Sequence, residues 1–539
     1  MASLPQVIGC GGHRRHEVKK AKKNPKAFYK FVNSKLKTSY RVTDILSGDD
    51  ELVSRDAGKA EVFSTYFSSV FTQEENVNQM PDFCVSVKET LGNVEFAALD
   101  VLKLLQNLNP SKLLGPDNMH PRILKECAPE LAEPLYMLFR KSLDEGRIPS
   151  PWKVANVTPG FKKGSRMTAS NYRPISLISV CCKTMEKLIR DALIKHMIDN
   201  GFLIDCQQGF VKGRSCTTEL LEVVDKLCAL LDNGDTVDMV YLDFAKAFDS
   251  VLHRRLLFKL QQYGITGPLL DWIKSFLLSR MQRVGVGGAM SSRAEVLSGV
   301  LQGSVLGPIL FICYVNDMPD SIAAFIYMYA DDTKLFTSST DRTVLQRDLD
   351  VLGEWSRSWQ LRYNVDKCKV MQVGRPVERE AYVMQDINGI SYPLQAVELE
   401  KYLSVWTDSK LTFSDHAEHA VSKANQILGL IGRTFTYLDI PLLEQLYTTM
   451  VRPHLEYSNT VWHPHFRKNI DLLESVQHRA TRIMPYEERL KLMDLPTLSY
   501  RRLRGDAIET YKFVHGKYSN WVTSLPVADN ISTMATLSN

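Results

Sequence analysis

Hydrophobic residues recur at helical spacing over much of the chain. Between Glu95 and Ser142 the apolar positions follow this spacing, and Gly115-Pro116-Asp117 interrupts it with a turn signal. Thr217 to Asn233 predicts one long helix, and Leu256 to Leu278 predicts two helices separated near Gly264. These stretches indicate a fold with a large helical component.

Shorter apolar runs between these helices predict strands. We expect residues 151–215 to be rich in short strands and turns, and the apolar run Val237–Leu242 to form a strand. Residues 324–336 predict a β-hairpin, whereas helical periodicity returns after Asp341 and is expected to dominate to the end of the chain. The alternation of helices and strands predicts an α+β fold with a helical C-terminal region.

The most distinctive polar residues lie in the predicted hairpin. Asp331 and Asp332 follow Tyr329-Ala330 and are flanked by strand-forming residues, which places them at the predicted hairpin tip. Adjacent carboxylates repel one another unless a cation neutralises them, and Mg²⁺ prefers carboxylate, phosphate and water oxygens. The pair therefore indicates a magnesium site, although so short a string is weak evidence by itself.

A third carboxylate follows the predicted strand Val237–Leu242. If this strand pairs beside the hairpin, the side chain of Asp243 comes to lie against Asp331 and Asp332. Three clustered carboxylates can hold two Mg²⁺ ions about 4 Å apart, an arrangement suited to phosphoryl transfer. A helix N-cap is the alternative role of Asp243.

Length, composition and charge suit a globular protein of several subdomains. The chain has 539 residues, of which 44% are hydrophobic and 24% charged, and this argues against disorder throughout. A net charge of +5 permits a nucleic-acid partner without demonstrating one. The basic stretch from Arg14 to Lys37 suits nucleic-acid steering, a nuclear address or a solvated tail. Because no apolar run could span a bilayer or form a signal peptide, we expect an intracellular protein with no membrane partner.

Six short motifs occur in order along the chain. They are WKVANVTPGFKKGSR (152–166), NYRPISLISV (171–180), YLDFAKAFDSV (241–251), SGVLQGSVLGP (298–308), YADDTKLF (329–336) and NVDKCKVM (364–371). In order and spacing they closely resemble the reverse transcriptases of non-LTR, LINE-like retrotransposons of the jockey and chicken-repeat type. The resemblance runs from about Asn24 to Lys517.

The resemblance implies a right-hand polymerase fold with fingers, palm and thumb. It divides the chain into a basic N-terminal extension (1–90), fingers with part of the palm (91–235) and a palm with motifs A to E (236–405). A thumb (406–460) and a helical, basic C-terminal region (461–539) follow.

The resemblance also implies which residues perform catalysis. Asp243, Asp331 and Asp332 match the metal-binding catalytic carboxylates, which take two Mg²⁺ ions. Phe248 matches an aromatic steric gate that clashes with a ribose 2′-hydroxyl and so favours deoxynucleotides. Lys367 matches a palm lysine proposed to protonate the leaving pyrophosphate.

Further matches imply how the nucleotide is bound. Arg173 and either Lys162 or Lys163 match cations of the fingers that hold the triphosphate, with plain surface cations as the alternative. Gln302 matches a glutamine near the nucleotide and template, and its flanking glycines allow the backbone to approach closely.

The activity implied by the resemblance is RNA-directed DNA polymerisation, in which nucleotides are added to a primer 3′-hydroxyl. The implied partners are an RNA template, a DNA primer and deoxynucleoside triphosphates, while the oligomeric state stays open. The nucleus is the favoured compartment. Such elements usually encode an endonuclease ahead of the polymerase, and we expect this chain to lack it.

Several positions differ from the family pattern. Leu301 stands where proline is usual, Leu113 and Leu114 replace a Ser-Pro pair, and Ser404 and Trp406 alter the turn that normally grips the primer. A displaced primer grip would slow the reaction, because a shift of about 1 Å in a reacting group costs roughly 10²-fold in rate. The second hypothesis is therefore a catalytically weak or inactive nucleic-acid-binding remnant of the same fold.

Basic residues in the C-terminal third suggest contacts with phosphates. Lys423 and Arg433 lie in the stretch 411–460 that matches the thumb, and a solvated face is their alternative. A second basic region is expected to anchor template RNA; it comprises Arg479, Arg482, Arg489, Lys491, Arg501, Arg502 and Arg504.

Overall fold

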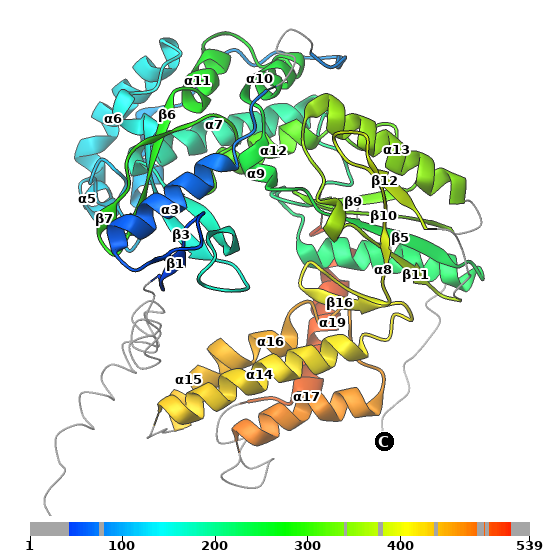
Figure 1. The fold of residues 1–539 in the computed structure, drawn as a ribbon. Helices are drawn as coiled ribbons and strands as arrows, with labels where there is room; N and C mark the ends of the chain where they lie inside the picture. Colours follow the sequence, from blue (N-terminus) through cyan, green and yellow to red (C-terminus); the bar gives the residue numbers. More distant parts are fainter. Residues whose placement is uncertain are drawn as a thin grey trace, which may run out of the picture.

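Two five-stranded sheets, with helices around them, make up most of the described chain (Figure 1). The computed structural model describes residues 42–74, 80–338, 342–375, 381–435, 440–481, 490 and 495–518. In Figure 1 the elements follow a curve that begins at α3 and β1, passes through β5 and β10, and ends at helices α14 to α17.

The first sheet has the strand order β14-β11-β5-β10-β9. Its central strand β5 (Val237–Leu242) is entirely buried, and both β10 (Asp332–Ser338) and β11 (Lys369–Val373) pair with it in antiparallel fashion. Strand β9 (Phe325–Tyr329) forms a hairpin with β10, and β14 (Gln395–Ala396) lies parallel beside β11. The predicted strand and hairpin are therefore confirmed, and they are neighbours in one sheet.

The second sheet has the strand order β4-β3-β6-β7, with β8 paired to β6. The hairpin of β3 (Val154–Phe161) and β4 (Tyr172–Leu177) carries the first two sequence motifs. Strand β6 (Arg280–Val286) lies parallel to β3 and also pairs with β7 (Ala289–Met290) and β8 (Ala294–Val296).

Helix α3 (Asp56–Ser69) packs on this second sheet. Its Phe63 ring meets Tyr172 of β4 edge-on with the ring centroids 4.8 Å apart, and the same cluster buries Val157 and Val284. Residues 56–69, ahead of the first motif, are therefore part of the fold around the sheet.

One large hydrophobic core joins several helices to one face of the first sheet. Helix α12 (Gly307–Val315, sequence GPILFICYV) is buried on nearly all sides, as an apolar helix must be, and packs in this core with α7, α10 and α11. The helices of this part are α4 (Ala98–Gln106), α5 (Pro121–Glu126), α6 (Ala128–Asp144), α7 (Val180–Asp199), α8 (Cys216–Asp232), α9 (Ala247–Ser250), α10 (His253–Gln262), α11 (Gly267–Leu277) and α13 (Arg342–Trp359). Across the described ranges, no helix has the length and apolar character needed to cross a membrane.

A second hydrophobic cluster covers the opposite face of the first sheet. Met239 and Tyr241 of β5 and Phe336 of β10 point into it, because successive side chains of a strand alternate between faces. The cluster also contains side chains of the hairpin β15–β16 (Leu399–Tyr402, Val405–Asp408) and of the C-terminal helices. These helices are α14 (Ser414–Thr434), α15 (Ile440–Leu446), a π-helical turn (Tyr447–Val451), α16 (Pro453–Glu456), α17 (Arg467–Ala480) and α19 (Leu498–Val514).

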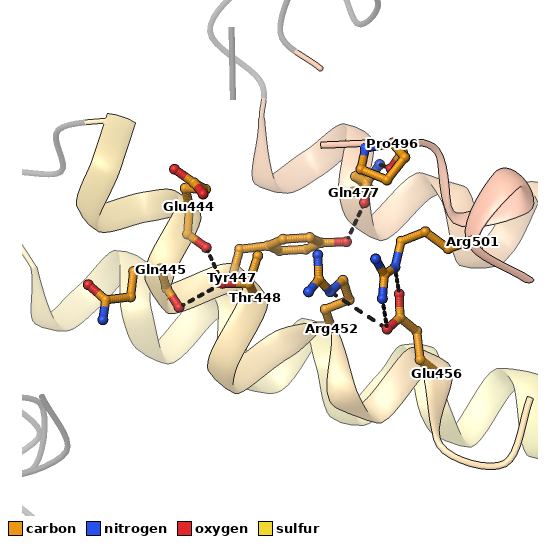
Figure 2. A network of polar contacts seen from close by, with 9 residues as sticks. All are labelled: Glu444, Gln445, Tyr447, Thr448, Arg452, Glu456, Gln477, Pro496 and Arg501. Atoms are coloured by element: carbon orange, nitrogen blue, oxygen red, sulfur yellow. Dashed lines mark hydrogen bonds and ion pairs between the residues drawn. The ribbon is translucent and has the colours of Figure 1, made fainter. Parts of the chain in front are cut away.

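A polar network links α16, α17 and α19 (Figure 2). The Tyr447 hydroxyl donates to Gln477 Oε1 at 2.8 Å, so the π-helical turn is joined to α17. Arg501 of α19 donates two hydrogen bonds to the carboxylate of Glu456, whose Oε2 also pairs with Arg452 Nε at 3.6 Å. Charged side chains of the C-terminal helices thus contribute to their mutual packing.

Two expectations about secondary structure are wrong. Residues 151–215 contain the 20-residue helix α7 in addition to strands. Its helical pattern is obscured because polar Thr184, Glu186 and His196 lie on its buried side. Residues 369–408 contain β11 to β16, which the helical periodicity expected after Asp341 did not predict. These strands have only two to five residues each, too few positions to establish a period of two.

His416 of α14 makes the packing of β15–β16 on the C-terminal helices sensitive to pH. Its Nδ1 accepts a hydrogen bond from Trp406 N at 3.2 Å, and its ring meets Trp462 edge-on at 4.5 Å. Burial lowers the pKa of His416 to about 4 from its ordinary 6.5. Between pH 6.5 and 4 the imidazole is protonated in the unfolded chain but neutral in the folded chain. The contribution of neutral His416 to the stability of the fold is therefore complete above about pH 6.5 and decreases as the pH falls toward 4.

Replacing His416 with Gln removes this titration. Lowering the pH from 7.5 to 4.5 should reduce the free energy of unfolding less in the variant than in the parent chain. We expect the difference between the two reductions to be up to about 3 kcal/mol. Urea unfolding followed by circular dichroism measures the difference, and His515→Gln at an exposed position of the same region is the control. An unchanged pH dependence in His416→Gln would contradict the assignment.

Candidate active site

The predicted acidic pair lies at the turn between β9 and β10. Asp332 is the first residue of β10 and pairs with Tyr329 across the hairpin, so Ala330 and Asp331 form the tip. Ala330 has a φ of 58°, in the left-handed region that an alanine rarely adopts. The turn is therefore conformationally strained at the residue next to the carboxylates.

The register between β10 and β5 brings the third carboxylate to this turn. Thr333 pairs with Leu242 in antiparallel fashion. Continuing this register, Asp332, which precedes Thr333, lies level with Asp243, which follows Leu242. Residues directly opposite in an antiparallel pair have Cα atoms about 4.5–5.5 Å apart. Asp243, Asp331 and Asp332 thus gather at one end of the two strands, as expected from the sequence.

Mutual repulsion of these carboxylates is visible in their proton affinities. Burial first, and then the charges of Asp331 and Asp243, raise the pKa of Asp332 to about 6. Burial and the charge of Asp243 also raise the pKa of Asp331. Bringing three acidic groups together therefore costs free energy that a cation would relieve.

Three cations from distant segments face the carboxylates. Lys162 follows β3 and Arg173 lies on β4, and the charges of both lower the pKa values of Asp331 and Asp332. Lys367 reaches the site from another segment, with its Nζ 2.6 Å from Asp243 Oδ2. The pKa of Lys162 is itself lowered, first by partial burial and then by repulsion from Arg173 and Lys367.

The structure distinguishes between the two candidate lysines at the end of β3. Lys162 N donates to Asn171 O at 2.8 Å, so the β3–β4 hairpin extends to this residue. The charge of Lys162 lowers the pKa values of Asp331 and Asp332. Exposure does not separate the two lysines, because both are exposed.

Phe248 and Gln302 lie on two segments that contact each other. Phe248, in α9, is partly buried and stacks on Phe311 of α12 with the ring centroids 4.6 Å apart. Its carbonyl oxygen accepts a hydrogen bond from Val300 N at 2.7 Å. The carbonyl oxygen of Gln302 accepts from Ser176 N of β4 at 2.8 Å, which joins the second and fourth motifs.

The donor set of the site consists of carboxylate oxygens, the ligand type that Mg²⁺ prefers. Among the described residues, no three His, Cys, Asp or Glu side chains form a metal-coordinating group. One oxygen of Asp243 is engaged by Lys367, which partly neutralises the cluster.

Two residues of the second basic region, Arg501 and Arg502, are not free to bind phosphates, which corrects the expectation from the sequence for these two positions. Arg502 is buried with 2% of its surface exposed, and Arg501 is engaged with Glu456 (Figure 2). Arg479 and Arg504 are exposed and stay candidates. Positions 482, 489 and 491, and the N-terminal basic stretch 14–37, lie outside the described residues. Lys423 and Arg433 are exposed on α14.

A buried polar cluster near the site was not predicted. Lys334, two residues after Asp332, is buried with its Nζ 4.0 Å from the ring centroid of Tyr402, whose hydroxyl donates to Glu219. Burial raises the pKa of Glu219 and lowers that of Lys334. The lysine among the apolar residues of β10 was the sequence signal that could have indicated this cluster. The cluster connects β10, α8 and the β15–β16 hairpin.

Known proteins are similar to this chain in sequence. The model of the reverse transcriptase (RNA-dependent DNA polymerase) family matches residues 161–419. The chain is 26% identical over 487 residues to the probable RNA-directed DNA polymerase from transposon BS of Drosophila melanogaster, a match that covers 85% of this chain and 52% of that protein. It is 28% identical over 450 residues to the RNA-directed DNA polymerase from mobile element jockey of the same species, covering 79% and 48%.

A third relative is the probable RNA-directed DNA polymerase from transposon X-element of Drosophila melanogaster. It is 25% identical over 455 residues, covering 80% of this chain and 49% of the relative. The chain thus spans about half the length of the curated relatives it matches. The family model thus identifies a reverse transcriptase (RNA-dependent DNA polymerase) domain at residues 161–419, and the similar proteins are named as RNA-directed DNA polymerases of mobile elements.

Proposed function

We propose that this chain is an RNA-directed DNA polymerase that adds deoxynucleotides to a primer 3′-hydroxyl on an RNA template. The observation that carries the proposal is the register of β10 on β5, which sets Asp332 level with Asp243 beside Asp331. Lys162, Arg173 and Lys367 add positive charge at the same place. Carboxylates for metal ions, together with cations for a triphosphate, are what nucleotidyl transfer requires.

The proposal interprets the fold as fingers, palm and thumb. The β3–β4 hairpin and helices α4 to α8 correspond to fingers and part of the palm (91–235). The first sheet, together with β6 to β8 of the second sheet, falls in the palm (236–405). Helices α14 to α16 correspond to the thumb (406–460), followed by the C-terminal region (461–539). Residues 1–90 are the N-terminal extension, although α3 packs on the second sheet.

Two Mg²⁺ ions are the proposed cofactors, because the strand register brings three carboxylates to one end of β5 and β10. Within the described residues these side chains are not arranged as a ready-made coordinating group, and Asp243 is held by Lys367 instead. Asp243, Asp331 and Asp332 offer only oxygen donors, and burial, followed by the charges of Asp331 and Asp243, raises the pKa of Asp332 to about 6. Bound there, the ions would lower the pKa of the primer hydroxyl and bind triphosphate oxygens.

The remaining side chains supply binding and discrimination. Lys162 and Arg173 hold the negative charge of the triphosphate, and Lys367, whose Nζ lies 2.6 Å from Asp243 Oδ2, gives a proton to the leaving pyrophosphate. Phe248 excludes a 2′-hydroxyl, and its stacking on Phe311 fixes the orientation of its ring. Gln302 lies near the nucleotide and template, on a segment joined to β4. The nucleus stays the favoured compartment from the sequence.

Asp331→Asn tests the catalytic assignment directly. We expect primer extension on an RNA template with Mg²⁺ and deoxynucleotides to fall by on the order of 10³-fold, because the loss of one fixed charge from a reaction centre has this size. Asp350→Asn, at an exposed position of α13, should retain the parent rate. A folded parent chain that makes no product would favour the inactive nucleic-acid-binding remnant.

Lys162 and Lys163 form a matched pair for testing triphosphate binding. We expect Lys162→Ala to raise the KM for deoxynucleotides by about 10-fold, equivalent to about 1.4 kcal/mol. Lys163→Ala should change KM less than about 3-fold, because the electrostatic effect on the carboxylates comes from Lys162. Steady-state extension kinetics with varied nucleotide measure both values, and the opposite order would exchange the two roles.

Phe248→Ala tests the choice of sugar. Removing the ring should lower the preference for deoxynucleotides over ribonucleotides by about 10- to 10²-fold in the ratio of kcat/KM values. The ratio is taken within one variant, so it is independent of any stability lost with the Phe311 stack. An unchanged ratio would assign Phe248 to packing alone.

A further inference from the structure

The turn that carries the proposed catalytic carboxylates needs an external support. Ala330, immediately before Asp331, adopts a φ of 58°, and a residue with a Cβ pays for this conformation with steric strain. The structure supplies the support from a segment more than a hundred residues earlier in the chain.

Gln207 contacts the turn directly. Its side-chain Oε1 accepts a hydrogen bond from Ala330 N at 2.9 Å and a second from Gly209 N at 2.8 Å. The side chain is 1% exposed, so these bonds do not compete with water. One amide oxygen thereby links the peptide unit of the strained alanine to the loop that contains Gln207.

The backbone of the same segment runs alongside β9. Gln208 N donates to Met328 O at 2.7 Å, and Met328 N donates to Cys206 O at 2.9 Å, as in a short parallel strand pair. A Cβ at Gly209 would come within 2.5 Å of Ala330 N, so only glycine permits this approach. Residues 206–209 are therefore in close contact with the hairpin up to its tip.

Arg214 fixes the shape of this loop. Its Nη1 donates to the carbonyl oxygens of Ile204 and Asp205, both at 2.9 Å, and to that of Gln207 at 2.5 Å. Its side chain is 5% exposed, and its Nη2 pairs with Asp205 Oδ1 at 3.6 Å. The backbone of Gln207 is thus restrained independently of its contact with Ala330.

This arrangement retains an unfavourable feature. The Nε2 of Gln207 is buried and has no hydrogen-bond partner among the residues that the structure describes. A buried donor without a partner and a strained alanine both cost stability, and such features persist where they serve a site. A simple packing role for position 207 would be served as well by an apolar side chain.

We infer that Gln207 is a positioning residue for the polymerase reaction: its amide oxygen holds the Ala330 peptide, and through it Asp331 and Asp332, in the geometry that catalysis uses. The inference rests on the proposed function. It predicts loss of rate without loss of substrate binding, because Gln207 contacts the turn and a displacement of about 1 Å in reacting groups costs roughly 10²-fold.

The neighbouring Gln208 provides a matched control. It is equally buried, at 1% exposure, but its side-chain Nε2 bonds to Glu222 at 3.2 Å instead of the turn. Gln207→Met and Gln208→Met each replace a buried amide with an apolar side chain of similar length. Gln207→Asn and Gln208→Asn repeat the comparison with a smaller change in polarity, should a methionine variant fail to fold.

Two measurements on the full chain test the inference. In primer extension on an RNA template, we expect Gln207→Met to lower kcat by about 30- to 100-fold with the nucleotide KM within about 3-fold, and Gln208→Met to change neither. In hydrogen exchange followed by mass spectrometry, we expect peptides that contain residues 329–333 to exchange at least about 10-fold faster in Gln207→Met but not in Gln208→Met.

The outcomes separate this inference from the proposed function. Unchanged exchange of residues 329–333 in Gln207→Met would overturn the inference even if the parent chain proved inactive. An active parent chain whose kcat is retained in both Gln207→Met and Gln207→Asn would overturn it as well. If the parent chain is inactive but residues 329–333 exchange faster in Gln207→Met, the result supports the contact with Gln207 and counts against the proposed function alone.

Discussion

Electrostatic repulsion among three carboxylates is the constraint on which the rest of the structure depends. Asp243 and Asp332 are brought level by the pairing of β5 with β10, and Asp331 precedes them at the turn. Burial raises the free energy of ionising Asp332, the charges of Asp331 and Asp243 add to it, and the pKa of Asp332 rises to about 6. A buried strand pair is what keeps these groups together, because a less rigid support would let them separate.

The second sheet has to be held against the first for the cations to reach the carboxylates. Ser176 N of β4 donates to Gln302 O, and a Cβ at Gly303 would lie 2.6 Å from Ser176 O, so the two segments are in direct contact. The buried carboxylate of Glu186 on α7 accepts hydrogen bonds from Val305 N and Leu306 N at the start of α12. These contacts connect the hairpin that carries Arg173 with the core beneath the carboxylates.

The candidate site could be predicted from the sequence to a considerable extent. The acidic pair, the strand before Asp243 and the ordered motifs all have local signals, and the observed strands carry them where expected. The β11 to β16 strands had no such signal, because two to five residues establish no period. Arg501 and Arg502 were expected to bind phosphates, because a sequence shows charge but not burial. In the structure Arg501 pairs with Glu456 and Arg502 is buried.

The sequence by itself determined the type of chemistry, since the identity and order of the acidic, basic and aromatic residues are local properties. It also determined β5 and the β9–β10 hairpin, whose patterns depend on neighbours within a few positions. Only the tertiary structure decided that Thr333 pairs with Leu242, that Lys162 rather than Lys163 acts on the carboxylates, and that Gln207 reaches Ala330. The physical reason is that strand register and side-chain partners are set by packing between segments distant in the chain, which no local pattern encodes.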